Sequence, residues 1–210
     1  MPIRIGVLVS GQGTNLQALI EAIEHEALPA TIALVATNNP DAPALERAAR
    51  HGLPTLIASR ATYPRREDRH QAIRDALEQA TVGLVVLAGF NEVLRPSFVW
   101  RFEGRLINTH PSLLPAFGGG MHAVRDALEH GVKLSGCTVH FVTEAVDEGP
   151  IVLQRCVEVY EDDTEVALHA RIREQEHRAL PEAVRLFAEG RLRLEGRRVR
   201  IVASLAAPTH

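Results

Sequence analysis

The sequence of 210 residues contains only two cysteines, Cys137 and Cys156, and their spacing matches no metal-binding motif. Both lie in apolar runs with a strand-like pattern, so we expect two reduced thiols in the core of a cytoplasmic protein. The sequence also lacks the motifs H-E-x-x-H and C-x-x-C, and no serine or cysteine sits in a nucleophile elbow. We therefore expect neither a metal ion nor a covalent enzyme intermediate.

Long hydrophobic runs and an excess of one charge are missing too. No apolar run approaches the roughly 20 residues that a membrane-spanning helix needs, and the first residues lack the basic and apolar regions of a signal peptide. The 23 basic and 26 acidic residues give a formal net charge of −3, so no broad field favours nucleic acid or a membrane surface. We expect small-molecule partners only, and a monomer or a weak homodimer.

What the sequence does contain is a regular alternation of strand and helix patterns between residues 3 and 108. This alternation predicts right-handed βαβ units and an α/β fold with a doubly wound, mostly parallel sheet. Residues 137–160 indicate an antiparallel extension, and a long helix is predicted over residues 164–188. We expect a single domain over residues 1–202 and a disordered tail over residues 203–210.

The first predicted strand, residues 3–9, runs into the glycine-rich turn Ser10–Asn15, and a helix pattern follows directly. Backbone N–H groups of such a turn and the helix dipole form an anion site. Leu16 replaces the third glycine of the dinucleotide signature G-x-G-x-x-G, and the turn lacks the lysine of a Walker loop. A phosphate monoester therefore fits better than a pyrophosphate, and a purely structural turn is an equal alternative.

A second polar cluster is expected where an apolar strand ends in Asn108 and His110. Their spacing of two places both side chains on one face of the strand, and Pro111 stops the strand. Ligands bind at such strand ends in open α/β sheets. Asp147 follows the next strand of the sheet and can reach the same crevice. Its carboxylate is expected to raise the pKa of His110 above about 6.5.

An imidazolium and an amide N–H that converge on one point suit a developing oxyanion, and Asp147 can relay a proton, directly or through water. Without a protein nucleophile, the attack must come from a second substrate or from water. The chemistry predicted from these residues is acyl transfer. The alternative is that each polar residue is structural; His140, in the predicted strand 137–142, is expected to be a packed core histidine.

Several segments together resemble the folate-dependent formyltransferase family, in register from about residue 3 to residue 190. They are Ser10–Leu16, Val86–Phe90, Ile107–Pro115, Val139–Thr143, Asp147–Ile151 and Gln175–His177. The resemblance implies a Rossmann-like fold, 10-formyltetrahydrofolate as the co-substrate, and an acceptor that is a ribonucleotide of purine biosynthesis. It also implies that Asn108 and His110 stabilise the formyl oxyanion, that His110 is the general acid, and that Asp147 supports it.

The same resemblance implies two binding regions. Gly13, Thr14 and Asn15 match the residues that bind the phosphate of the acceptor, and Glu176 matches a carboxylate that contacts the acceptor. The residues matched to the folate pocket are Arg66, Phe90, Asn91, Glu92, Val93, Leu94, Asn108 and Val142.

The sequence departs from the family pattern at two places. Asn91-Glu92-Val93-Leu94 stands where relatives commonly have Met-Arg-Ile-Leu, which leaves side-chain contacts from the first two positions open. The loop Gly118–His122 replaces a pattern that contains Phe-Pro-Gly, and we consider a mobile lid and a plain linker equal alternatives.

Three alternatives for the function follow from the residues and the family. Formyltetrahydrofolate deformylases share the three catalytic residues and pass the formyl group to water, but they carry an N-terminal regulatory domain, and here the first strand is predicted at residue 3. Methionyl-tRNA formyltransferases carry a further nucleic-acid-binding domain, whereas only residues 189–210 follow the long helix. A non-catalytic nucleotide-binding module would explain the glycine-rich turn but not the polar cluster.

Overall fold

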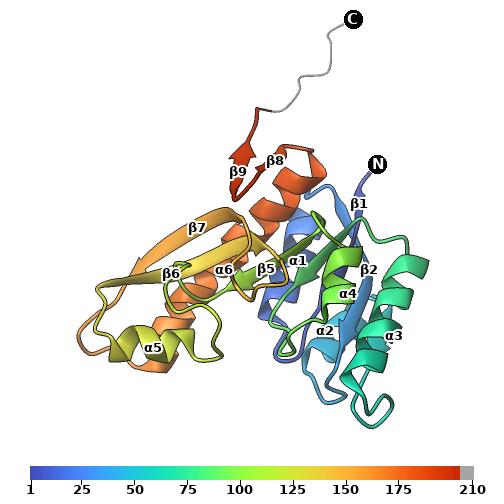
Figure 1. Ribbon diagram of the computed structural model, residues 1–210, viewed down its shortest axis with the longest axis horizontal. Helices are drawn as coiled ribbons and strands as arrows, with labels where there is room; N and C mark the ends of the chain where they lie inside the picture. Colours follow the sequence, from blue (N-terminus) through green and yellow to red (C-terminus); the bar gives the residue numbers. More distant parts are fainter. Residues whose placement is uncertain (204–210) are drawn as a thin grey trace, which may run out of the picture.

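The computed structural model describes residues 1–203, which form a single nine-stranded sheet covered by helices (Figure 1). The strand order is β3-β2-β1-β4-β5-β6-β7-β9-β8. In chain order the elements are β1 (Ile3–Leu8), α1 (Thr14–His25), β2 (Ala30–Thr37), α2 (Ala44–Arg50), β3 (Thr55–Ile57), α3 (Arg66–Gln79), β4 (Leu84–Leu87), α4 (Pro96–Arg101), β5 (Leu106–His110), α5 (Ala123–Glu129), β6 (Leu134–Phe141), β7 (Ile151–Glu158), α6 (Glu165–Ala188), β8 (Leu192–Glu195) and β9 (Arg198–Ile201).

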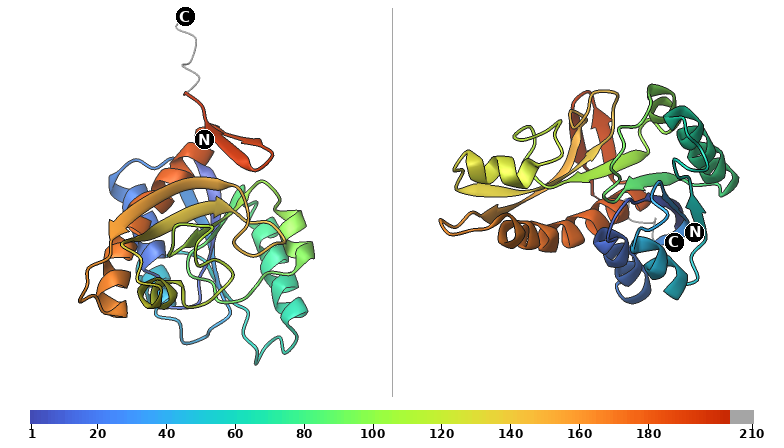
Figure 2. Two further views of the ribbon diagram at one scale, coloured as in Figure 1. Left: turned by 60° about the vertical axis from the view of Figure 1, so that its left-hand side comes forward. Right: turned by 90° about the horizontal axis from the view of Figure 1, so that it is seen from below.

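The five strands β3, β2, β1, β4 and β5 are all parallel, and helices cover both of their faces (Figure 2). Apolar residues of α1, α2 and α6 pack in one core, while those of α3 and α4 pack in a second core with the alternate residues of the strands. A sheet buried on both faces needs apolar residues at every position, which is the pattern of β4. The predicted doubly wound fold is therefore confirmed.

The antiparallel extension is also present. β6 pairs antiparallel with β5 and with β7, and the hairpin β8–β9 joins the far edge of the sheet. Because β6 runs opposite to β5, β6 ends beside the start of β5, where Phe141 pairs with Ile107. The segment between β6 and β7 folds back from there and brings Asp147 to His110. The tail expected from residue 203 lies, from residue 204 onward, outside the described residues.

The two cysteines differ from expectation in one respect. Cys137 in β6 is buried, and this burial raises the pKa of its thiol to about 12. Cys156 in β7 is exposed, so its expected place in the core is wrong. β7 packs on α6 with one face only, and Cys156 lies on the opposite face. Within residues 1–203 no helix has the length and apolar character to cross a membrane.

Candidate active site

Asn108, His110 and Asp147 meet at one cavity, as the sequence predicts. The cavity has a volume of about 320 Å³ and opens at the carboxyl ends of β4 and β5. Asn108 and His110 come from β5, and Asp147 comes from the turn between β6 and β7. The backbone of Asp147 has a φ angle of 57°, a left-handed conformation that aspartate tolerates better than most residues.

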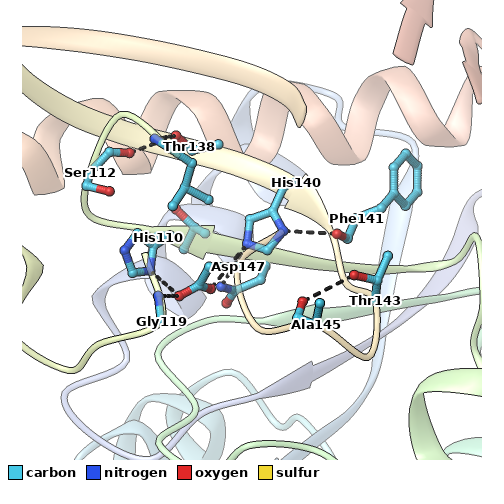
Figure 3. Close-up of polar contacts among 12 residues, drawn as sticks. His110, Ser112, Gly119, Thr138, His140, Phe141, Thr143, Ala145 and Asp147 are labelled. Carbon is cyan, nitrogen blue, oxygen red and sulfur yellow. Dashed lines mark hydrogen bonds and ion pairs between the residues drawn. The ribbon is translucent and has the colours of Figure 1, made fainter. Parts of the chain in front are cut away.

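The carboxylate of Asp147 lies between two histidines (Figure 3). Its Oδ2 is 3.4 Å from Nδ1 of His110, and its Oδ1 is 3.6 Å from Nε2 of His140. The backbone N–H of Gly119 donates to Oδ2 at 2.9 Å. Burial raises the pKa of Asp147, but the nearby ring of His140, the hydrogen bond from Gly119 and the charge of His110 outweigh it and lower that pKa overall. Asp147 is therefore ionised at neutral pH.

The expected increase of the His110 pKa is wrong. His110 is only 6% exposed, and this burial lowers the pKa more than Asp147 and the carbonyl group of Phe117 raise it. Nε2 of His110 lies 3.1 Å from the Phe117 carbonyl oxygen. The loop that follows β5 thus removes water from the ring and favours the neutral imidazole.

His140 is buried as expected, but it belongs to the site rather than to the apolar core. Its Nδ1 lies 2.9 Å from the carbonyl oxygen of Phe141, to which it donates when the ring is neutral. Nε2 then accepts a hydrogen bond from Nδ2 of Asn108 at 3.2 Å. The amide has two N–H donors, so His140 orients the group and leaves one donor for a ligand.

The predicted anion site forms at the N-terminus of α1. Gly13 caps the helix with a φ angle of 70°, and a Cβ atom there would lie 2.7 Å from the side chain of Ala44. Only glycine fits this position. Asn15 is buried, and the structure gives its side-chain oxygen no hydrogen-bond partner among the described residues. A ligand with a donor group can satisfy that atom.

Glu176 of α6 connects the anion site with β5. Its two carboxylate oxygens accept from Nδ2 of Asn15 at 3.3 Å and from Oγ1 of Thr109 at 3.4 Å. Burial raises the pKa of Glu176, and these hydrogen bonds only partly offset the effect. Arg173, one turn earlier on α6, acts on this carboxylate through its charge and was not singled out from the sequence.

Most of the residues matched to a folate pocket line the cavity. They are Phe90, Asn91, Glu92, Val93, Leu94, Asn108 and Val142. Arg66 is exposed at the start of α3 and is not among the lining residues, whereas Arg69, three residues later, is buried behind the cavity wall. Helical phase explains the difference, because Arg69 lies on the face of α3 that carries Ile73 into the core. In residues 1–203 no group of His, Cys, Asp and Glu side chains has the arrangement of a metal site.

The fold and these residues define a class of formyl-transferring proteins, and comparison with known proteins agrees. The family model described as formyl transferase matches residues 3–184, so the chain belongs to this family. The resemblance seen in the sequence is thereby confirmed.

Individual relatives narrow the class. The chain is 43% identical over 192 residues to the phosphoribosylglycinamide formyltransferase of Haemophilus influenzae, covering 91% of this chain and 90% of the relative. It is 52% identical to the crystal structure of glycinamide ribonucleotide transformylase 1 from Symbiobacterium toebii, with a TM-score of 0.93 and coverage of 96% and 95%. A formyltetrahydrofolate deformylase from Burkholderia mallei is more distant, at 32% identity and a TM-score of 0.87, with coverage of 97% of this chain and 71% of the other.

Proposed function

We propose that this chain transfers the formyl group of 10-formyltetrahydrofolate to the amine of phosphoribosylglycinamide in purine biosynthesis. The observation that carries the proposal is the meeting of Asn108, His110 and Asp147 in a cavity that Glu176 connects to an anion site. A transferase needs two adjoining binding regions, one for the donor and one for the acceptor. A hydrolase needs only the first.

The donor occupies the cavity, where apolar side chains of Phe90, Val93, Leu94 and Val142 contact the folate ring system. The acceptor places its phosphate on the backbone N–H groups of Gly13, Thr14 and Asn15, where the dipole of α1 favours an anion. The positive charge of Arg173 adds to this attraction. Glu176 accepts hydrogen bonds from the acceptor and directs its amine toward β5.

The amine nitrogen then attacks the formyl carbon, and the carbonyl oxygen becomes an oxyanion. The free N–H of Asn108 stabilises this charge in a site with little water, and the Nε2–H of His110 does so when it exchanges the Phe117 carbonyl oxygen for the oxyanion. The ionised Asp147 balances positive charge on His110 and takes part in moving the amine proton to the folate nitrogen that leaves. The C–N bond to the folate breaks, and tetrahydrofolate and the formylated ribonucleotide remain.

The experiment follows tetrahydrofolate release from 10-formyltetrahydrofolate with and without phosphoribosylglycinamide, together with the mass of the ribonucleotide. We expect release only when the ribonucleotide is present, with a gain of one formyl group on it. Release at the same rate without the ribonucleotide would instead identify a deformylase. A failure to release tetrahydrofolate under either condition would favour a non-catalytic binding module.

We further infer a cytoplasmic location, a single domain over residues 1–202, and a monomer or a weak homodimer without nucleic-acid or membrane partners. The free thiols of Cys137 and Cys156 support a reducing compartment, and the continuous sheet from β3 to β8 supports one domain. Sedimentation velocity at several protein concentrations tests the oligomeric state.

A further inference from the structure

Asn91 and Glu92 occupy the cavity wall at the positions where the family commonly has methionine and arginine. In this chain both side chains are hydrogen-bonded within the protein. Glu92 is bonded to α3 behind the wall, and Asn91 is bonded to residues that follow β1 and β2. The wall segment from Phe90 to Leu94 is therefore held from two sides.

Glu92 uses both of its carboxylate oxygens within the protein. Nη2 of Arg69 donates to Oε1 at 2.7 Å, and Nε2 of His70 lies 3.1 Å from Oε2. The side chains of Arg69 and His70 are each 3% exposed, and that of Glu92 is 11% exposed. The buried guanidinium group of Arg69 therefore compensates the negative charge of Glu92 within the cavity wall.

The ring of His70 fixes the direction of this network. Its Nδ1 accepts a hydrogen bond from the backbone N–H of Arg95 at 3.2 Å, so the proton of the neutral ring is on Nε2 and points at Glu92. Burial lowers the pKa of His70 and favours the neutral ring, although Glu92 partly offsets this. α3, the wall segment and the start of α4 are thus linked through one imidazole.

Arg69 anchors the network to the chain that precedes α3. Its Nη1 donates to the carbonyl oxygens of Tyr63 at 2.8 Å and Pro64 at 3.1 Å. Three hydrogen bonds hold this guanidinium group, so its position, and through it that of Glu92, is well determined.

Asn91 connects the same wall to the loop that begins the anion site. Its backbone N–H donates to Oγ of Ser10 at 3.0 Å, and its Oδ1 accepts from Nδ2 of Asn38 at 2.8 Å. Ser10 in turn donates to Oδ1 of Asn38 at 2.7 Å. The donor cavity and the glycine-rich turn therefore share one hydrogen-bonded frame.

We propose that Asn91 and Glu92 are positioning residues, which set the place of the wall segment Phe90–Leu94 against the co-substrate through Arg69, His70 and Asn38. The inference rests on the proposed function, because it assigns the donor to this cavity. Glu92 contributes no charge to the donor. The cavity-lining residues of the described chain include no lysine or arginine, so the glutamate portion of a folate gains no ion pair there.

The test measures by calorimetry the Kd of tetrahydrofolate and of tetrahydropteroate, which lacks the glutamate portion. For Glu92→Gln we expect the Kd of both ligands to increase by the same factor, about tenfold, because the uncompensated Arg69 displaces the wall. The KM of the ribonucleotide should change less than twofold. Glu67→Gln is the matched control, since it makes the same chemical change at an exposed position of α3 and should leave both Kd values unchanged.

Two further variants examine the same network. Arg69→Gln should increase both Kd values by a factor similar to that of Glu92→Gln. The double variant should bind the ligands no more weakly than either single variant, because both substitutions remove the same interaction. Asn91→Ala changes an exposed residue and leaves the buried pair of Arg69 and Glu92 intact, so we expect this variant to fold. It should increase both Kd values about threefold, a smaller factor because it removes one neutral hydrogen bond.

Unchanged Kd values in folded Glu92→Gln and Asn91→Ala proteins would overturn the proposal. So would an effect on tetrahydrofolate alone, because it would mean that Glu92 acts on the glutamate charges directly. These binding results do not depend on turnover. Failure of the wild-type protein to formylate the ribonucleotide would therefore refute the proposed function and not the role of the network.

Discussion

The turn that carries Asp147 depends on Gly149, and Gly149→Ala is predicted to reduce activity strongly. A Cβ atom at position 149 would lie 1.7 Å from the carbonyl oxygen of Phe141, at the end of β6. Contacts of a real Cβ atom under 3.0 Å essentially never occur, so one of the two backbone segments must move by about 1.3 Å. The clash is with backbone, and no side-chain rotation can relieve it.

This movement passes directly to the catalytic residues. The Phe141 carbonyl oxygen accepts the hydrogen bond from Nδ1 of His140, and Asp147 is two residues before Gly149. A misplacement of about 1 Å costs about 10²-fold in rate, which corresponds to about 2.7 kcal/mol in the activation free energy. Overpacking also destabilises the fold, by about 1–3 kcal/mol. We therefore expect kcat to decrease about 10²-fold in a protein that still folds.

The assay measures kcat at saturating concentrations of both substrates and follows unfolding by circular dichroism. Glu148→Ala is the control, because this exposed residue lies in the same turn and its substitution introduces no clash; its kcat should stay within twofold of the wild type. A folded Gly149→Ala protein with normal kcat would refute the reasoning. A loss of activity that only follows the fraction of unfolded protein would refute it as well.

Three further predictions concern individual side chains and pH. His110→Ala should reduce kcat by about 10²–10⁴-fold with little change of either KM, because a positioned proton-transfer group is removed. A near-normal kcat of the folded variant in steady-state kinetics would contradict this role. Glu176→Gln should raise the KM of the ribonucleotide at least about tenfold and leave the KM of the folate unchanged, since a hydrogen bond to a charged group contributes about 1.5–3 kcal/mol; equal changes of both KM values would argue against its assignment to the acceptor. The free energy of unfolding should decrease as the pH falls from about 6.5 toward 5, because burial lowers the pKa of His70 and His110 in the folded protein, while the unfolded chain takes up protons from about pH 6.5 downward. Each histidine contributes at most about 1.4 kcal/mol per pH unit to the slope of the unfolding free energy against pH. Urea unfolding of the wild type and of His70→Gln at pH 7.5, 6.5 and 5.5 measures this slope. Equal slopes of the two proteins would contradict the account.

Local sequence patterns were sufficient to predict the parallel sheet and the position of the polar cluster. β5 ends in polar residues that a core strand would not tolerate, and Asp147 follows the next strand of the sheet closely enough to reach the same crevice. Both conclusions need only the period of a strand and the rule that ligands bind at strand ends. Side-chain positions in the site could be predicted to this extent because they depend on backbone topology.

The role of His140 could not be predicted in this way. Its place beside Asn108 depends on the antiparallel register of β5 and β6, which pairs these two residues. A shift of one position would turn His140 to the other face of the sheet. The only signal in the sequence was a histidine within an apolar strand, which a structural histidine would give equally.

The direction of the His110 pKa shift could not be predicted from the sequence either, for a different reason. Two opposing effects determine the pKa of His110: the charge of Asp147 raises it, and the loss of water around the ring lowers it. The charge partner could be inferred from spacing, but the burial comes from the loop after β5, whose conformation no periodic pattern describes. The same limitation applies to Arg66 and Arg69, because a uniform run of charged residues hides the phase of the helix.

The glycines of the loop Gly118–Gly120 acquire a specific explanation from these contacts. Gly119 has a φ angle of 77° and donates its N–H to Asp147, so a side chain would strain the donor that holds the carboxylate. A Cβ atom at Gly118 would lie 2.9 Å from the side chain of Leu114 and 3.3 Å from that of Asp147. The loop therefore serves the site through its backbone, and the absence of side chains is what allows the backbone to approach. The loop departs in sequence from the family pattern. It can support the same chemistry as long as the N–H of Gly119 still donates to Asp147.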